Sequence, residues 1–453
     1  MGVYWDVMTF CDRLPEDIER MKWAGDWDGA KRRIGYLLGQ DIPHRLRARL
    51  ALEGERIEDI RRSYCYDREA ALSLMREKVP DFTEADLDRL DDMGATDFTY
   101  ENGKRKYLRS FRSTLLKVNP EIRARAGIAQ DASPTKTDLL IKEIMEKGEK
   151  RVRLHIRASL RVRDGAFVKG ETYTVHLPIP APSEQTKDIA LLGFSHEPYR
   201  IAPEDAWQRT VCFKETLREN ETFWVEYEYT QDCRYYRYGD TERVYSFDAP
   251  PTEADLAEEQ PHLVFTPYLR ALHDELAGDE KDPLAAAKKF YDYITKHITY
   301  SYVRHYSAID HGAEYLATNL KGDCGLQALL FIALCRMHGI PARWQSGLAA
   351  EPGDVGCHDW AQFYIEGPGW LFCDPSYGGG AVRSGKEWRR EFYFGNLEPY
   401  RMAANRGYAK PFDPPKSFFR ADPFDSQDGE AETSAGPLFG KDTETEQECR
   451  EVE

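Results

Sequence analysis

The chain has 453 residues and a mass of 52.3 kDa, which predicts two to four domains with ample room for hydrophobic cores. No stretch reaches the roughly 18 consecutive apolar residues of a transmembrane helix. The first twenty residues carry five acidic side chains where a secretory signal needs an apolar run. These features exclude an integral membrane or secreted protein, and we expect a cytoplasmic protein with no membrane association.

The net charge of −16 is unevenly distributed. Residues 421–453 hold eleven acidic and two basic side chains, a net of −9, which leaves −7 for the other 420 residues. Because no basic footprint exists for a phosphate backbone, we expect no nucleic-acid partner. The nine cysteines are scattered without any C-x-x-C pair, so we expect reduced thiols, no metal site and no cofactor.

The N-terminal quarter of the chain predicts a helical domain over residues 1–125, followed by a helical linker over 126–149. In this region apolar residues recur at intervals of three and four, as in DIERMKWAGDWDGAKRRIGYLL and KRKYLRSFRSTLLKV. Thr83 and Asp86 have the spacing of a capping box. Nothing in the pattern indicates what these helices do.

Near residue 150 the hydrophobic period changes to two, which predicts an antiparallel β-sandwich over residues 150–250. Asp164-Gly165 is typical of a hairpin turn, here between strands at 152–163 and 166–177. Along the first strand, arginines alternate with apolar residues in RVRLHIRASLRV. That arginine row lies either in solvent or against an acidic partner, for which the chain's own tail is one candidate.

Pro-rich punctuation near 249–261 marks a linker, and an α+β core over residues 260–407 follows, beginning with a helix at 284–298. Beyond it, residues 408–453 are rich in Pro, Asp, Glu, Ser and Gly. We expect this acidic tail to be disordered, because it has few branched apolar residues to bury. The whole chain is therefore expected to be a multi-domain α+β protein.

Cys324 is predicted to stand at the first turn of a buried helix. Asp323 is a suitable N-cap, Gly339 a suitable C′ residue, and Pro341 prevents continuation. At a helix start, the macrodipole and free N–H groups stabilise a thiolate and can also donate to an oxyanion. Most cysteines near a helix start are structural, so the position alone does not assign a nucleophile.

A hairpin after this helix supplies a candidate base and its orienting acid. His358 begins the strand CHDWAQFYI, and Asp374 ends the returning strand WLFCD. Counting from the turn at 366–369 places Asp374 opposite residue 362, about 13 Å from His358 along the strand. On that register the two side chains do not meet without a bulge. A histidine at the rim or in the core is the alternative interpretation of His358.

Together, G-D-C-G at 322–325, G-I-P-A-R at 339–343, C-H-D-W at 357–360 and G-W-L-F-C-D-P-S at 369–376 resemble the motifs of the transglutaminase-like superfamily of thiol enzymes. The resemblance spans about 284–400 and implies a papain-like α+β core with Cys324, His358 and Asp374 as catalytic triad. The preceding strands resemble the β-sandwich of bacterial members. An aromatic side chain completes the oxyanion hole in animal members; Tyr300 and Tyr302 are candidates here, and Trp360 is a candidate groove wall.

The resemblance implies cysteine-dependent acyl transfer or hydrolysis on protein or peptide amides, through a thioester on Cys324 and without a metal. Two other functions stay open. One is a cysteine peptidase with the same triad. The other is a catalytically silent scaffold that binds a protein partner. The substrate, the acyl acceptor and the oligomeric state are not encoded in these patterns.

Overall fold

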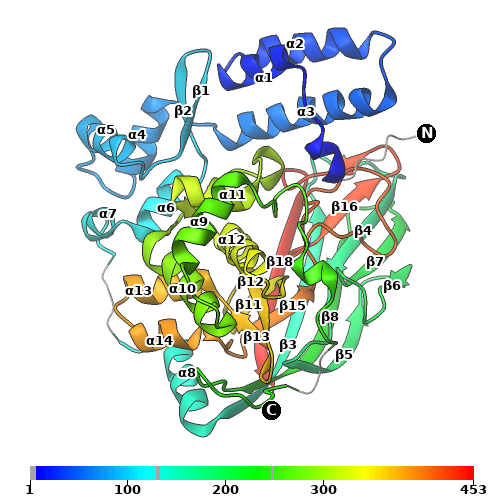
Figure 1. Ribbon diagram of the computed structural model, residues 1–453. Helices are drawn as coiled ribbons and strands as arrows, with labels where there is room; N and C mark the ends of the chain where they lie inside the picture. The colour runs from blue at the N-terminus through cyan, green and yellow to red at the C-terminus, as the bar shows by residue number, and fades with distance from the viewer. Residues whose placement is uncertain (1–6, 129–132, 246–248, 453) are drawn as a thin grey trace.

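The computed structural model describes residues 7–128, 133–245 and 249–452. It shows a mixed α+β protein in which a helical region lies over a central α+β core, with a β-sandwich beside the core (Figure 1). One continuous hydrophobic cluster runs through the sandwich and the core, whereas the helical region has two small clusters of its own. The sandwich and the core therefore form one packed unit.

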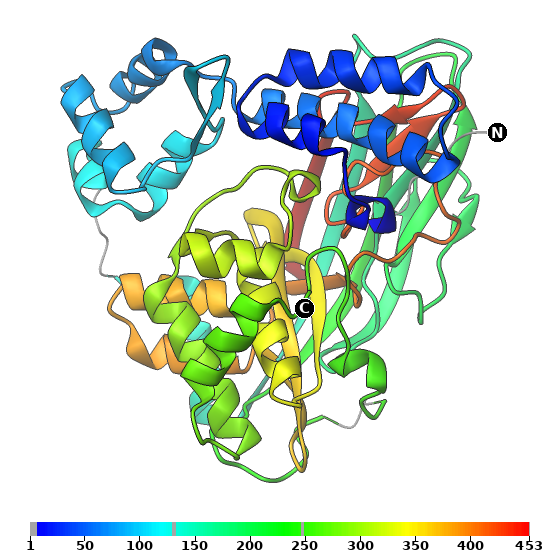
Figure 2. The ribbon, with the colours of Figure 1, turned by 45° about the horizontal axis from the view of Figure 1, so that its top comes forward.

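The N-terminal region forms two groups of helices, seen side by side above the core in Figure 2. It is not purely helical as the sequence predicted, because residues 104–107, expected in a helix, form the second strand of a hairpin. The capping box of Thr83 and Asp86 is confirmed. The elements are α1 Glu16–Trp23, α2 Trp27–Leu38, α3 His44–Ser63, α4 Arg68–Arg76, α5 Glu84–Asp92, β1 Phe98–Glu101, β2 Lys104–Tyr107, α6 Phe111–Val118 and α7 Pro120–Arg125, after a 3₁₀ turn at Val7–Cys11.

This helical region holds the chain just before Cys324. Lys321 Nζ donates to the carbonyl oxygens of Gly94 and Thr96, at 2.8 and 2.6 Å. Arg56, on α3, pairs with Asp310 at 2.9 Å. Charged donors bound to carbonyl and carboxylate oxygens fix backbone position well, so the helices support the loop that leads into the candidate site.

The β-sandwich consists of two sheets with strand orders β17-β16-β4-β7-β6 and β18-β3-β8-β5. Its inward faces are apolar because alternate residues of each strand point to the same side. Helix α8 (Lys136–Lys147) precedes the first strand. The strands are β3 Glu149–Val162, β4 Thr172–Pro178, β5 Thr186–Phe194, β6 Arg200–Ile201, β7 Thr210–Thr216, β8 Thr222–Arg234, β16 Glu430–Thr433, β17 Pro437–Leu438 and β18 Thr443–Val452.

The turn at Asp164-Gly165 does not form the predicted hairpin. β3 pairs with β8 on one side and β18 on the other, while β4 pairs with β7 and β16 in the opposite sheet. Because both edges of β3 are occupied, the residues after Val162 cross between the sheets instead of folding back.

The prediction of a disordered tail is wrong for the described residues 408–452. Strand β18 pairs with β3 over ten residues, so that Glu444 lies opposite Arg161 and Glu448 opposite Arg157. Opposite charges across neighbouring strands stabilise the pair, and the arginine row thus meets the chain's own acidic tail. In Figure 1 the red strand β18 crosses behind the core. Residues 443–451, TETEQECRE, alternate with the period of two that is typical of a strand, a signal that an assessment by composition alone does not detect.

The core carries a five-stranded antiparallel sheet of order β14-β13-β12-β11-β15, and the buried helix α12 packs against it (Figure 1). Phe331 of α12 meets Phe363 of β12 edge to face at 5.6 Å. The elements are α9 Pro267–Ala277, α10 Pro283–His297, β9 Thr299–Tyr300, α11 Gly312–Asn319, β10 Lys321–Gly322, α12 Cys324–Met337, β11 Ala342–Glu351, β12 Asp354–Ile365, β13 Gly369–Cys373, α13 Pro375–Arg383, α14 Glu387–Phe392, β14 Phe394–Gly395 and β15 Arg401–Asn405, with 3₁₀ turns at Glu253–Leu256 and Tyr306–Ala308.

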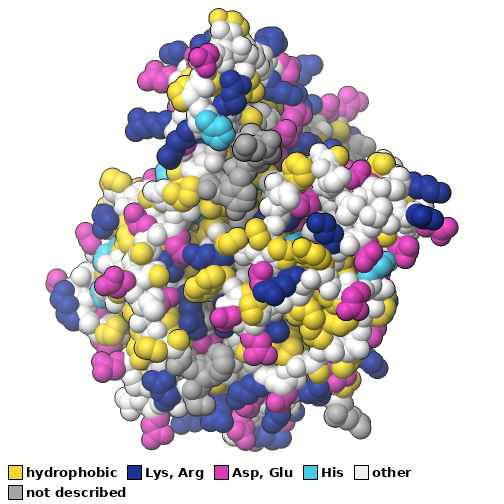
Figure 3. Space-filling model, turned by 90° about the vertical axis from the view of Figure 1, so that its right-hand side faces the viewer, with side chains coloured by type: hydrophobic (Ala, Val, Ile, Leu, Met, Phe, Trp, Pro, Cys, Tyr) yellow, Lys and Arg dark blue, Asp and Glu magenta, His cyan; other side chains and the backbone are white. Residues whose placement is uncertain are grey.

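Within the described ranges, every helix is too short or too polar to cross a membrane. The face in Figure 3 intersperses acidic and basic side chains with small hydrophobic groups. Such mixed charge gives no extended field of one sign over that face.

Candidate active site

Cys324 is the first residue of α12, as the sequence predicted. The Asp323 side chain caps the helix by accepting from Leu326 N at 3.2 Å, and Gly339, beyond its other end, has a φ of +83°. The backbone N–H of Cys324 is therefore one of the free donors at a helix start. The thiol is partly exposed, so it is placed to attack a carbonyl and to stabilise the oxyanion that results.

His358 and Asp374 contact each other directly. His358 Nε2 and Asp374 Oδ2 lie 2.7 Å apart, and both side chains are buried. The observed register pairs Ala361 with Cys373, which places Asp374 opposite Trp360 rather than residue 362. The turn is tighter than counting suggested, and the remaining diagonal offset is within reach of two side chains.

The proton positions in this pair follow from charge and burial. His358 and Arg401 hold the pKa of Asp374 below its ordinary value against the opposing effect of burial, so the carboxyl is ionised. Burial lowers the pKa of His358, which keeps the imidazole neutral. A neutral ring beside a carboxylate carries its proton on Nε2, and Nδ1 is left as the base.

Arg401 is a second partner of the acid, and sequence reasoning missed it. It lies 2.9 Å from Asp374 Oδ2 and also pairs with Glu398, at 2.9 Å. Its guanidinium stands 4.3 Å from the centre of the Tyr377 ring, which itself lies 4.4 Å from the His358 ring. The arginine is only 1% exposed. This buried network therefore fixes the orientation of both His358 and Asp374.

Cys324 lies beside a stretch of β12 that is no longer paired with β13. Strand β13 ends at Cys373, opposite Ala361, so β12 lacks this neighbour at residues 358–359. The backbone N–H of Asp359 bonds to the Cys324 sulfur and favours the thiolate. Cys324 is thus adjacent to the backbone of the residue that follows His358.

The thiol itself donates to Asp359 rather than to His358. Cys324 Sγ lies 3.3 Å from Asp359 Oδ2, and this is its side-chain hydrogen bond among the described residues. Burial, followed by the charges of Asp359 and Asp323, raises the pKa of Cys324 well above its ordinary value. In this conformation Cys324 is therefore a neutral thiol, and it would have to lose its proton to act as a nucleophile.

The three aromatic candidates occupy different environments. Tyr300 of β9 is paired with Gly322 of β10, and Gly322 precedes Cys324 by two residues. Its charge interacts with that of Cys324, which places it beside the nucleophile. Tyr302 contacts it edge to face at 5.5 Å and is exposed. Trp360 is 1% exposed, and its indole N–H donates to Gln345 at 2.7 Å. It is therefore buried and does not line an open groove.

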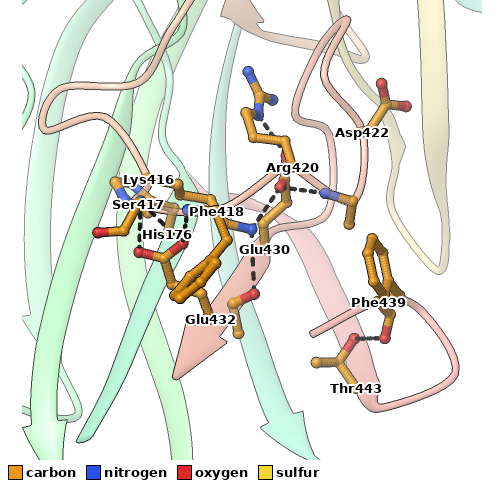
Figure 4. A network of polar contacts seen from close by, with 12 residues as sticks. His176, Lys416, Ser417, Phe418, Arg420, Asp422, Glu430, Glu432, Phe439 and Thr443 are labelled. Atoms are coloured by element: carbon orange, nitrogen blue, oxygen red, sulfur yellow. Dashed lines mark hydrogen bonds and ion pairs between the residues drawn. The ribbon is translucent and has the colours of Figure 1, made fainter. Parts of the chain in front are cut away.

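The C-terminal segment, predicted to be disordered, reaches the site. Gln427 Nε2 donates to the His358 carbonyl oxygen at 3.0 Å and to Asp359 Oδ1 at 2.5 Å. Other residues anchor this segment: Lys416 and Arg420 both pair with buried Glu430, at 3.0 and 2.8 Å (Figure 4). Since Gln427 holds the strand that carries His358, the tail is a structural part of the candidate site.

These contributions had weak sequence signals. Arg401 and Gln427 lie outside the four motifs, and only the fold brings them to the candidate site. Asp359 stands inside the C-H-D-W motif, yet its contact with the thiol depends on the free edge of β12.

A cavity of about 290 Å³ opens on the Tyr300 side of the site. Tyr377, which stacks near His358, also lines it. The cavity therefore reaches the aromatic ring that packs against His358. In the described part of the chain, no three His, Cys, Asp or Glu side chains are grouped to hold a metal ion.

Part of the chain is similar to known proteins. Residues 270–375 match the family model of the Transglutaminase-like superfamily. No curated protein matches the chain. A solved candidate cysteine protease from Cytophaga hutchinsonii is 18% identical, with a TM-score of 0.42 over 67% of this chain and 93% of that one. The periplasmic domain of TgpA from Pseudomonas aeruginosa is 18% identical, with a TM-score of 0.30 over 56% of this chain and 96% of that one. The chain thus carries a transglutaminase-like core over residues 270–375.

Proposed function

We propose that the protein transfers or hydrolyses acyl groups of protein or peptide amides through a thioester on Cys324. The observation that carries the proposal is the 2.7 Å contact between His358 and Asp374 next to a cysteine at a helix start. A histidine oriented by an ionised acid is the partner that activates a thiol nucleophile.

We propose the following chemistry for these groups. As the Cys324 sulfur bonds to the amide carbon, its proton passes to His358 Nδ1, and the Cys324 N–H stabilises the oxyanion. The imidazolium, held by Asp374, returns that proton to the departing nitrogen as the C–N bond breaks. An amine or water, deprotonated by His358, then attacks the thioester, and Cys324 leaves as the thiol. We propose Tyr300, which is paired with Gly322 near Cys324, as the second oxyanion donor.

A catalytically silent, partner-binding core is the second candidate, and one observation favours it. The thiol donates to Asp359, and its pKa is raised. A thiol in that state reacts slowly unless its proton is moved to a base. The reaction therefore depends on His358 acting as that base.

The test is a panel of peptide amides incubated with the protein and a fluorescent amine. We expect a covalent adduct on Cys324 that shows the mass of the acyl group, followed by amine incorporation or peptide cleavage. The Cys324→Ala variant must lose both, whereas Cys65→Ala, at an exposed cysteine, must keep both. Amine incorporation indicates transfer, and cleavage alone indicates a peptidase. Equal behaviour of wild type and Cys324→Ala refutes the enzymatic proposal.

A further inference from the structure

Two basic side chains from distant parts of the chain face the cavity beside Cys324. Lys117 comes from α6 of the N-terminal helical region, and Arg383 ends α13 of the core. Lys117 Nζ stands 3.8 Å from the centre of the Tyr300 ring, and its charge interacts with that of Cys324. The Arg383 charge interacts with Tyr300 as well. The positive charges thus lie at the end of the cavity next to the nucleophile.

Neither charge is neutralised by an acid of the described chain. The interactions of Lys117 are with Tyr300, Tyr302, Cys324 and Arg383, and none is with a carboxylate. Arg389, which lines the same cavity, differs because it pairs with Asp138 at 3.1 Å. Both Lys117 and Arg383 are exposed, yet desolvation by the surrounding protein lowers the pKa of each. Two unneutralised cations at one site favour the arrival of an anion.

The acidic residues of the cavity lie at its other end or are already paired. Glu398 is paired with Arg401. Glu351 accepts from Thr137 Oγ1 at 2.9 Å and is the cross-strand neighbour of Asp354, at the hairpin end of β11 and β12. Asp354 precedes His358 by four residues on an extended strand, a separation of about 13 Å. The cavity is therefore positive near Cys324 and negative away from it.

We propose that Lys117 and Arg383 form a clamp for a carboxylate that the peptide substrate carries close to the amide under attack. The inference rests on the proposed function and names its substrate class. The carboxylate comes either from the C-terminus of a peptide or from an acidic side chain, since both present the same anion to an ammonium and a guanidinium. The clamp also gives the N-terminal helical region a role, because α6 supplies half of it.

The first experiment compares two alkylating reagents that differ only in charge. Iodoacetate carries a carboxylate and iodoacetamide is its neutral counterpart. We expect the iodoacetate-to-iodoacetamide rate ratio at Cys324 to exceed the same ratio at exposed Cys65 by about threefold or more. Lys117→Gln and Arg383→Gln must each lower the ratio toward that of Cys65. Because the ratio compares two reagents at the same thiol, a change in the Cys324 thiolate fraction cancels from it. Equal ratios at both cysteines, or variants that leave the Cys324 ratio unchanged, overturn the clamp.

Matched variants control for general effects of charge. Lys78→Gln removes an exposed lysine of the same helical region, and Arg218→Gln removes an exposed arginine of the sandwich. Both must keep the wild-type ratio. If they reduce it as strongly as the clamp variants, long-range charge explains the preference and the clamp is refuted.

A binding measurement separates this inference from the proposed function. Hexapeptides free of acidic side chains, labelled with an uncharged fluorophore, are titrated onto the Cys324→Ala protein in three forms: free C-terminus, C-terminal amide, and C-terminal amide with one central glutamate added. We expect at least one carboxylate form to bind about threefold tighter than the plain amide, and the tighter form identifies the source. Equal binding of all three forms refutes the clamp, even if Cys324 is reactive. An unreactive Cys324 with a preserved carboxylate preference refutes the proposed function and supports the clamp.

Discussion

His358 Nε2 donates to Asp374 Oδ2 over 2.7 Å, although sixteen residues separate the two in sequence. The contact exists because the β12–β13 hairpin places Asp374 opposite Trp360, one diagonal step from His358. It leaves Nδ1 of a neutral imidazole free to accept the thiol proton.

Replacing the orienting acid separates catalysis from binding. Asp374→Asn keeps the shape of the site but removes the charge that holds His358 in the Nε2–H tautomer. We expect kcat on an amide substrate to fall by about 10²- to 10⁴-fold with little change in KM. Asp164→Asn, in the exposed turn after β3, is the control and keeps wild-type kinetics. Full activity of Asp374→Asn refutes the role assigned to this acid.

Removing Asp359, the acid beside the thiol, is expected to make Cys324 more reactive. The Asp359 charge raises the pKa of Cys324, so Asp359→Asn lowers that pKa. We expect Cys324 to be alkylated about tenfold faster at pH 7, which corresponds to a pKa shift of about one unit. The measurement is the iodoacetamide rate at Cys324, followed by peptide mass spectrometry. A slower rate indicates that Asp359, rather than His358, accepts the thiol proton.

Asp359→Asn is also expected to change how the free energy of unfolding depends on pH. Burial and the charge of Asp323 raise the pKa of Asp359 to about 7 in the folded protein, above its unfolded value of about 3.9. Because the folded state holds this proton more tightly, the wild-type side chain loses stability as the pH rises from about 4 to about 7. Asp359→Asn must therefore gain stability relative to wild type over that range and no further above it, as measured by urea unfolding. A constant difference from pH 4 to 8 contradicts the raised pKa.

Arg401 is expected to matter for stability as much as for orientation. Arg401→Met leaves the buried carboxylates of Asp374 and Glu398 without their shared cation. Breaking a buried ion pair in this way costs about 3–5 kcal/mol. Urea denaturation measures the loss, and Arg151→Met, in an exposed pair with Asp188, provides the comparison with an effect below about 1 kcal/mol. Equal effects of the two substitutions would show that the Arg401 network does not stabilise the fold.

The acidic tail is expected to be required for a stable sandwich. Deleting residues 441–453 removes β18 and exposes the edge of β3. It also removes Glu444 and Glu448 from opposite Arg161 and Arg157, although Glu226 of β8 still pairs with Arg157. We expect a lower Tm, by several degrees, and aggregation through the free strand edge. Thermal unfolding and light scattering measure both effects. A truncated protein with wild-type Tm that stays monomeric would match a disordered tail instead.

Local signals in the sequence were sufficient for the elements that carry the triad. The cap at Asp323, the stop at Gly339 and the alternation after Cys357 are short-range patterns, and the structure has α12 and β12 at those places. Register was harder, because a two-residue error in the turn moves Asp374 by two positions along β12. That error alone separated His358 from its partner.

Long-range contributions to the site could not be predicted from the sequence. Arg401 and Gln427 reach His358 only after β15 and the C-terminal segment have packed against the core. The tail was judged on its composition, which is acidic and poor in branched apolar residues. Its order comes from the pairing of β18 with β3, a strand far earlier in the chain, and composition cannot reveal such a partner.

Alkylation of Cys324 with and without His358 tests the central claim most directly. Wild type and His358→Ala are treated with iodoacetamide from about pH 5.5 to 8.5, and each cysteine is quantified by peptide mass spectrometry. We expect the alkylation rate of Cys324 to rise with pH because its thiol starts protonated, and to be lower in His358→Ala than in wild type, while the rate at exposed Cys65 stays the same in both proteins. A Cys324 that reacts equally fast in wild type and in His358→Ala would contradict a histidine-activated nucleophile.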